Sequence, residues 1–351
     1  MRPRTPNIGA VARAAGVSVG TVSNALNAPD RLAPETLERV LGIIEELGYI
    51  RSSAGRTLIR NAADDFSLIV PDIDNSLFVD IARGAQLTAA NAGQRLVMAN
   101  SGFSSHDLVA GDSAHDAQDD FLGYFAEARS GGVLVCAMRD PTIGIERIRN
   151  HVRPIVVVNF DVPGADWCTV LMDNEQAGRI AVEHVADLGI EHAVFVSIPD
   201  VVQPAAARRS GVRSAAAQRG IAVTEVDSTA LTEAAGRGIT TDLVDSLADR
   251  AARGERTALL FLSDDLAIGA LEVLRVAPGL RIPDDVVVMG MDGDHRPSGN
   301  DWMTMTSIEL PGYEMGAEGV RLLTAESDPS HTHERVVLPV RIRPGETTVG
   351  R

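Results

Sequence analysis

The alternation of short apolar runs with amphipathic helical patterns, from about residue 65 onward, constrains the fold more than any other feature of this chain. Segments that alternate in this way form parallel sheets with helices on both faces. The apolar runs predict strands at Ser67–Pro71, Arg95–Asn100, Gly132–Ala137, Ile155–Asn159, Thr169–Met172, His192–Ile198, Ala258–Ser263 and Val286–Met291. The 3.6-residue apolar period predicts helices at Phe78–Ala92, Glu175–Leu188, Ala206–Arg219, Thr232–Ala251 and Leu266–Val276. One sheet would be long for so many strands, so we expect an α/β body of two doubly wound parallel sheets, with a ligand crevice at the carboxyl ends of the strands.

The first 50 residues have a different pattern, that of three short helices around one small core. Apolar residues recur through Ile8–Ala15 and predict a first helix. Ser18 is a good N-cap for a second helix at about Val19–Asn27. Pro34 stands in the first turn of a third helix, which closes at Gly48. The arrangement predicts a helix-turn-helix domain.

The outward face of the second helix is built from small and polar residues, namely Gly20, Thr21, Ser23, Asn24 and Asn27. The major groove of DNA admits a helix whose side chains are slim and can form hydrogen bonds with base edges. The face therefore predicts a recognition helix. A solvated amphipathic helix in an ordinary three-helix bundle is the alternative that periodicity alone leaves open.

Charge is distributed unevenly along the chain. The formal net charge of −16 would by itself argue against nucleic acid, because binding to phosphates needs a cationic surface. Residues 1–60, however, hold eight arginines and five acids, a net charge of +3, so the remaining residues carry −19. A basic head on an acidic body confines the attraction for DNA to the head.

The run from Ile8 to Asn27, continued by Leu47-Gly-Tyr-Ile50, resembles the DNA-binding head of the lactose/galactose repressor (LacI/GalR) family. The resemblance adds Ser18 and Val19 to the DNA-facing set. It also implies a hinge helix within residues 51–65, in which Leu58 wedges apart a base step of the minor groove beside Arg56. Leu58 as an ordinary linker residue is the alternative. The family usually has arginine where this chain has Asn24. Asparagine pairs best with adenine, whereas arginine favours guanine.

The body resembles the periplasmic-binding-protein-like sensor of the same family over nearly its whole length. Matching landmarks are Val70–Phe78, Met172–Gly178, Arg208–Gly211, Ser263–Ala270, Ile282–Val286 and Gly290–Gly293. The resemblance implies that the chain crosses between two lobes near Leu171, Ile308 and Ser327. We therefore expect a helix-turn-helix domain at 1–50, a hinge at 51–65 and a core at 66–351, with lobe 1 at 66–170 and 309–326 and lobe 2 at 171–308 and 327–351.

The same resemblance, taken position by position, implies an effector site made of Asp72, Asn75, Phe78, Asn159, Arg208, Ser263 and Asp292. Hydrogen-bond acceptors around one arginine suit a sugar or another polyhydroxy or anionic metabolite. Leu231 stands where a stacking aromatic residue is common in the family, so Phe78, Phe160 or Trp302 would have to supply any stacking surface. Helix capping or turn formation by Asp264 and Asp292, and a surface ion pair for Arg208, are the alternatives.

Several other classes of protein are disfavoured. No G-x-S-x-G motif, P-loop or glycine-rich dinucleotide-binding motif follows a strand in this sequence, so we expect that the protein is not an enzyme. His331 and His333 could form a metal pair, but they have no further ligands beside them in the sequence, and we expect them to face solvent. Cys136 and Cys168 lie in strand-like runs and are expected to be buried, reduced thiols. We assign no metal and no cofactor.

These observations predict a DNA-binding transcriptional regulator, a repressor of the LacI type. We expect it to bind a palindromic operator as a homodimer and to be switched by a small-molecule effector, most simply a sugar. The sequence has neither a secretory apolar segment after Met1 nor an apolar run long enough for a membrane span, so we expect a cytoplasmic protein with no membrane partner. The alternative is a soluble solute-binding sensor whose head binds DNA without sequence specificity.

Overall fold

The computed structural model describes residues 7–49, 65–102, 117–152, 154–200, 202–293, 303–328 and 330–350. The chain divides into two compact units, Met1–Asp64 and Asp65–Arg351. No helix within the described ranges is both long and apolar enough to cross a membrane.

The first unit is a small helical domain, as predicted. It consists of α1 (Ile8–Ala15), α2 (Val19–Asn27), the 3₁₀ helix η1 (Pro29–Arg31) and α3 (Pro34–Glu46). The Ser18 hydroxyl caps α2 by accepting a hydrogen bond from the backbone N–H of Thr21 at 3.0 Å. One core residue from each helix, Val11, Val22 and Val40, is fully buried. The domain therefore holds α2 rigidly and leaves its other face open.

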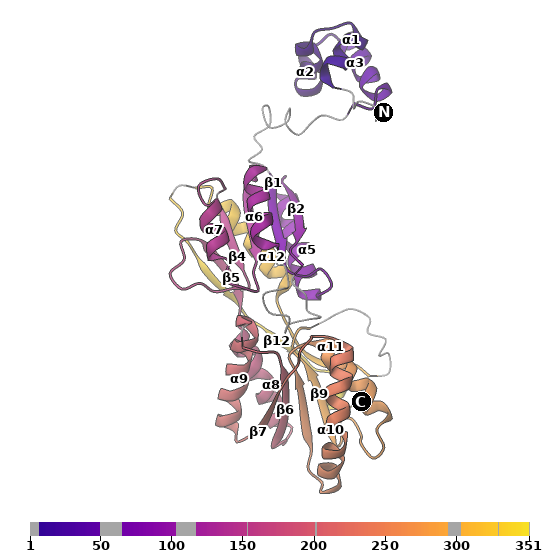
Figure 1. Cartoon of the computed structure of the whole chain (residues 1–351), viewed down its shortest axis with the longest axis vertical. Coiled ribbons are helices and arrows are strands. Elements are labelled where there is room, and N and C mark those ends of the chain that lie inside the picture. Colours follow the sequence, from indigo (N-terminus) through magenta and orange to yellow (C-terminus); the bar gives the residue numbers. More distant parts are fainter. Residues whose placement is uncertain are drawn as a thin grey trace. The chain divides into compact units, whose positions relative to one another are not determined.

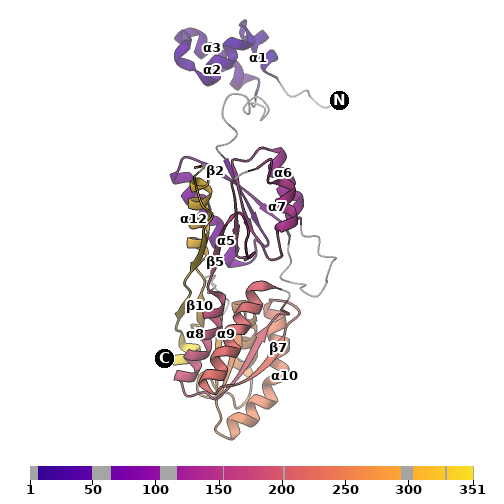
Figure 2. The same cartoon turned by 90° about the vertical axis from the view of Figure 1, so that its left-hand side faces the viewer.

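The second unit contains two six-stranded sheets, each flanked by helices (Figures 1 and 2). Lobe 1 is built from β1 (Asp65–Val70), β2 (Arg95–Asn100), β3 (Gly132–Cys136), β4 (Ile155–Val158), β5 (Cys168–Met172) and β11 (Arg335–Leu338), with α5 (Ser76–Asn91), α6 (Gln118–Glu127), α7 (Thr142–Ile148) and α12 (Gly312–Ala325). Lobe 2 is built from β6 (His192–Ser197), β7 (Ala222–Asp227), β8 (Thr257–Phe261), β9 (Val286–Gly290), β10 (Thr306–Glu309) and β12 (Arg341–Arg343), with α8 (Asn174–Asp187), α9 (Gln203–Arg219), α10 (Glu233–Ala252), α11 (Asp264–Val276) and α13 (Glu346–Val349).

The two sheets have the same winding. Their strand orders are β11-β5-β4-β3-β1-β2 and β12-β10-β9-β8-β6-β7, and all neighbours are parallel except β10 and β12. Along β3, Leu134 and Cys136 pack on the side of α5 and α12, whereas Val133 and Val135 pack on the side of α6 and α7. Burial on both faces explains why the central strands appear in the sequence as unbroken apolar runs.

Three segments connect the lobes, and the position of one of them differs from the expectation. The first two follow β5 and β10, close to the positions expected from Leu171 and Ile308. The third was expected near Ser327. It lies instead between β11 and β12, because Arg335–Leu338 pair in parallel with Thr169–Met172 and so keep the chain in lobe 1 as far as Leu338.

Three pairs of helices cross at glycines that face the backbone of the partner helix. A Cβ on Gly211 of α9 would lie 1.9 Å from the carbonyl oxygen of Glu175 in α8. A Cβ on Gly178 of α8 would lie 2.0 Å from the carbonyl oxygen of Arg208 in α9. The same reciprocal arrangement joins α5 to α12 and α10 to α11, at Gly84 with Gly316 and at Gly236 with Gly269. Any larger side chain would push these helices apart.

Candidate functional site

The candidate DNA-contacting surface is the face of α2 opposite its buried residues. Val22 and Ala25 are buried, whereas Ser18, Gly20 and Asn24 are exposed. Val19 is also exposed, and Thr21 and Ser23 are partly so. This face therefore combines hydroxyl and amide groups with little bulk. The side chain of Asn27, and the hinge residues Arg56 and Leu58, lie outside the described residues.

The candidate effector site is an open cavity between the two lobes, with about 490 Å³ of empty space that includes solvent at its mouth. It lies where parallel strands of both sheets end, which is where ligands bind in open α/β sheets. Six of the seven residues expected to contact an effector line it, namely Asn75, Phe78, Asn159, Arg208, Ser263 and Asp292. Asp72 is not among the lining residues, and its carboxylate accepts a hydrogen bond from the backbone N–H of Asp74 at 2.9 Å. Asp72 thus shapes the turn that leads to the cavity.

Apolar side chains make up much of the cavity wall and were not expected from the sequence. Met138 follows β3, Met172 ends β5, and Ile198 and Leu262 follow β6 and β8. Their position directly after a strand was a signal that could have identified them. Leu231, which stands where an aromatic residue is common in the family, also lines the cavity, and so does Phe78.

Arg208 is the central cation of the cavity and is buried, which excludes the alternative of a surface ion pair. Its Nε donates to Asn174 Oδ1 at 2.9 Å, and its Nη1 donates to the carbonyl oxygens of Leu262 and Met291 at 3.2 and 3.1 Å. Burial lowers the pKa of Arg208 to about 10, although Asp292 and Asp264 oppose that shift, so the guanidinium is charged at neutral pH. Nη2 has only the Met172 sulfur at 3.9 Å among the described residues, which leaves donors for a ligand.

Two carboxyl groups share the space beside Arg208. Asp292 Oδ1 accepts a hydrogen bond from the backbone N–H of Asp264, the first residue of α11, at 2.8 Å. Asp292 therefore also helps to cap this helix, which was the alternative to a ligand-binding role. Ser307 donates to Asp264 Oδ1 at 2.6 Å. Burial and the neighbouring Asp264 carboxylate raise the pKa of Asp292 well above its usual value. The pair therefore favours holding a proton.

Asn159 is the cavity residue whose geometry points most clearly to a ligand. Its φ of 69° places it in the left-handed region, which asparagine tolerates better than most residues. Its side chain is buried, and its Nδ2 contacts the Met138 sulfur at 3.4 Å. Its Oδ1 has no hydrogen-bond partner among the described residues. An unpaired buried acceptor costs about 1–3 kcal/mol, so a ligand that donates a hydrogen bond to this oxygen would be favoured.

Replacing Asp292, whose pKa is raised, tests the electrostatics of the cavity. Because the pKa of Asp292 is raised on folding, the folded chain binds more protons than the unfolded chain above pH about 4, and its stability falls as the pH rises through the raised pKa. Asp292→Asn removes that titration and keeps an oxygen acceptor. We expect the stability of the variant relative to the parent to increase from acid to neutral pH in urea unfolding. A relative stability that is independent of pH would contradict the assignment.

Comparisons with known proteins agree with both units. The family model for "Bacterial regulatory proteins, lacI family" matches residues 7–52, and the family model for "Periplasmic binding protein-like domain" matches residues 182–348. The HTH-type transcriptional repressor CytR of Escherichia coli (strain K12) is 30% identical over 326 residues, which cover 92% of this chain and 89% of CytR. The ribose operon repressor of Halalkalibacterium halodurans is 28% identical over 347 residues, which cover 97% and 96% of the two chains.

A solved structure extends the agreement to three dimensions. The complex of the transcriptional regulator CelR with cellobiose matches with a TM-score of 0.64 at 27% identity and covers 97% of this chain and 99% of the other. The matches span the helical head and the two-lobed body, and the two named relatives are transcriptional repressors. The chain therefore belongs to the lacI family of bacterial regulatory proteins.

Proposed function

We propose that this regulator represses transcription by binding a palindromic operator as a homodimer, and that a sugar or similar polyhydroxy metabolite in the interlobe cavity switches the binding. The observation that carries the DNA-binding part is the open face of α2, where Asn24 and the residues beside it stand opposite a fully buried Val22. Four to six side chains on one short helix can read only a few base pairs. A symmetric pair of heads would supply the remaining specificity.

Self-association is supported by apolar surface on lobe 1. Val97 and Met98 of edge strand β2 are 50% and 49% exposed, and Leu87 of the neighbouring helix α5 is 51% exposed. Exposed apolar side chains on an edge strand are a place where a second sheet or subunit can pack. We assign this surface to contacts between two copies of the chain.

The effector part rests on Asn159 and Arg208. Asn159 has an unpaired oxygen acceptor, and Arg208 has an Nη2 whose described contact is the Met172 sulfur alone. Both side chains line the cavity between the lobes. A polyhydroxy ligand donates to the first and accepts from the second. A ligand that contacts both lobes changes the balance between their relative orientations, and we propose that the hinge residues around Leu58 transmit this change to the heads.

Selection of genomic DNA fragments by the purified full chain at fixed salt tests this proposal. We expect an enriched inverted repeat, and we expect Asn24→Ala to lose discrimination at one base pair in each half-site, worth about 1–3 kcal/mol. Asn91→Ala, which removes an exposed asparagine at the end of α5, is the matched control and should leave the preference unchanged. Salt-sensitive binding without an enriched sequence would instead show a head that binds DNA non-specifically.

A further inference from the structure

A cluster of four side chains in lobe 1 lies outside the effector cavity and has no part in the function proposed above. Cys168 begins β5, Glu326 follows the end of α12, and His331 and His333 precede β11. One ligand atom from each of the four lies within 4.8 Å of the others. The sequence separates Cys168 from the histidines by more than 160 residues, and the fold places two more potential ligands beside His331 and His333.

We propose that Cys168, Glu326, His331 and His333 form a binding site for a divalent transition-metal ion, with Zn²⁺ as the best match. Thiolate, imidazole and carboxylate are the ligands that zinc uses in proteins, usually four in a tetrahedron. Magnesium and calcium require oxygen ligands, so the donor set disfavours them. Zinc bonds of about 2.0–2.3 Å in a tetrahedron place ligand atoms about 3.3–3.8 Å apart, and the four ligand atoms here lie within 4.8 Å of one another.

The contacts within the cluster already approach this geometry. Cys168 Sγ lies 3.1 Å from His331 Nε2, and His333 Nδ1 lies 3.3 Å from Glu326 Oε1. Small rotations of the side chains would turn these contacts toward a shared ion. The pairing of β5 with β11 fixes the backbone of the cluster, because the Thr169 N–H donates to the Glu334 carbonyl oxygen at 2.8 Å.

The surroundings of Cys168 suit a metal-bound thiolate. The backbone N–H of Glu334 donates to Cys168 Sγ at 3.2 Å, a contact of the kind that orients and stabilises a ligating sulfur.

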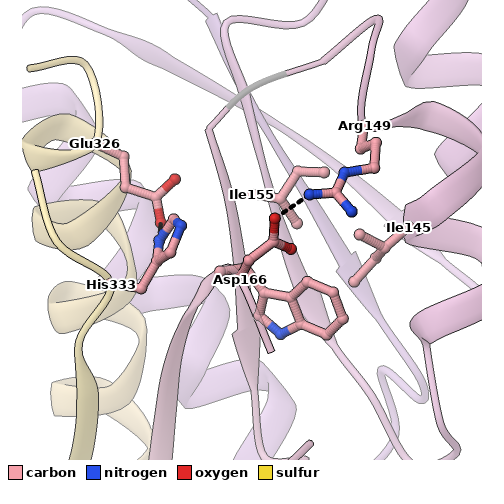
Figure 3. A pocket seen from close by; sticks show the side chains of 7 residues that line it. Ile145, Arg149, Ile155, Asp166, Glu326 and His333 are labelled. Carbon is pink, nitrogen blue, oxygen red and sulfur yellow. Dashed lines mark hydrogen bonds and ion pairs between the residues drawn. The ribbon is translucent and has the colours of Figure 1, made fainter. Parts of the chain in front are cut away.

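An adjacent cavity is lined by two of the four ligands, Glu326 and His333. Figure 3 shows Glu326 and His333 side by side on one wall and the ion pair between Arg149 and Asp166 on the other. His333 is 38% exposed, whereas the Glu326 side chain is 9% exposed. Of these two ligands, His333 is therefore the one that solvent reaches more readily.

The proposed site lies at the end of β5 opposite the effector cavity. Cys168 begins this strand and Met172, which lines the cavity, ends it. Five residues of strand separate the two sites by roughly 13–17 Å. A bound ion would join the end of α12 to the starts of β5 and β11, the two strands of lobe 1 that lead into lobe 2. We therefore assign the ion a structural role in lobe 1.

Titration of the full-length, chelator-treated protein with Zn²⁺ and with Co²⁺ tests the proposal. We expect one tightly bound ion per chain, a Tm that rises with zinc, and a cobalt spectrum with intense four-coordinate bands and a thiolate charge-transfer band. Cys168→Ala should abolish the charge-transfer band. Cys136→Ala, which removes the buried thiol at the end of β3, is the matched control and should keep it.

A second variant keeps the test valid if loss of Cys168 impairs folding. His333→Ala removes the most exposed of the four ligands and should weaken metal affinity at least about 100-fold, because even outer contacts of a metal site are worth 10–100-fold. Failure of the parent protein to retain one equivalent of either ion would overturn the proposal. So would a cobalt spectrum that is the same in the parent, Cys168→Ala and His333→Ala proteins.

Discussion

Arg208→Met is expected to lower the free energy of unfolding by about 3–5 kcal/mol at neutral pH, because it removes the cation beside two buried carboxyl groups and leaves their charge uncompensated. It also removes hydrogen bonds to the carbonyl oxygens of Leu262 and Met291, where β8 and β9 end. Urea unfolding of the full chain at constant pH measures the loss. We expect this loss to be smaller at acid pH, where the carboxyl pair takes up a proton.

A double-mutant cycle separates this electrostatic effect from the loss of packing. In the Asp292→Asn background one of the two carboxyl groups that Arg208 faces is absent, so Arg208→Met should cost less than it does alone. Arg209→Met is a neighbouring control, because Arg209 is also buried but pairs with Asp200, Glu225 and Asp227 and is not among the residues that line the cavity. Equal losses for Arg208→Met in both backgrounds would show that Arg208 and Asp292 are not coupled.

Gly211→Ala is expected to destabilise the body by about 3 kcal/mol, the upper end of the usual range for overpacking. The new Cβ would lie 1.9 Å from the carbonyl oxygen of Glu175, and a backbone atom cannot move aside as the end of a flexible side chain can. Helix α9 would have to separate from α8 and would carry Arg208, one turn earlier, away from its partners. We therefore expect both a lower midpoint in urea and weaker effector binding.

Gly238→Ala provides the matched control for this substitution. Gly238 lies on the exposed face of α10, and a Cβ there would meet no atom within 4 Å. Alanine is favoured over glycine in a helix by about 1 kcal/mol, so this variant should be slightly more stable than the parent. If both variants shifted stability by the same amount and in the same direction, close helix packing would not be the cause.

Strands that form unbroken apolar runs could be predicted from the sequence, whereas the short or more polar strands β7, β10, β11 and β12 could not. The central strands, such as β3 with five buried residues, appear as unbroken apolar runs. Edge strand β7 contains the polar residues Thr224, Glu225 and Asp227, and edge strand β11 has only four residues, none of them fully buried, so neither forms a long apolar run. The missed β11 is also the reason that the third crossing was placed near Ser327.

The effector cavity was predictable to the extent that its residues follow strands or match the family. Asn159 and Asp292 were found in this way, although nothing in the sequence indicated the left-handed backbone of the first or the proton-sharing partner of the second. The cluster around Cys168 was missed because its members come together only when β11 pairs with β5. Contacts between distant segments need the folded chain, whereas periodicity reports only local structure.

The measurement that tests the central claim most directly is the ratio of two affinities of the full chain at one fixed salt concentration. One is for the operator enriched by fragment selection, and the other is for the same bases in shuffled order. The account predicts a ratio of at least about 10³, as for sequence-specific regulators. A ratio close to one would contradict it, since the head would then bind only the phosphate backbone.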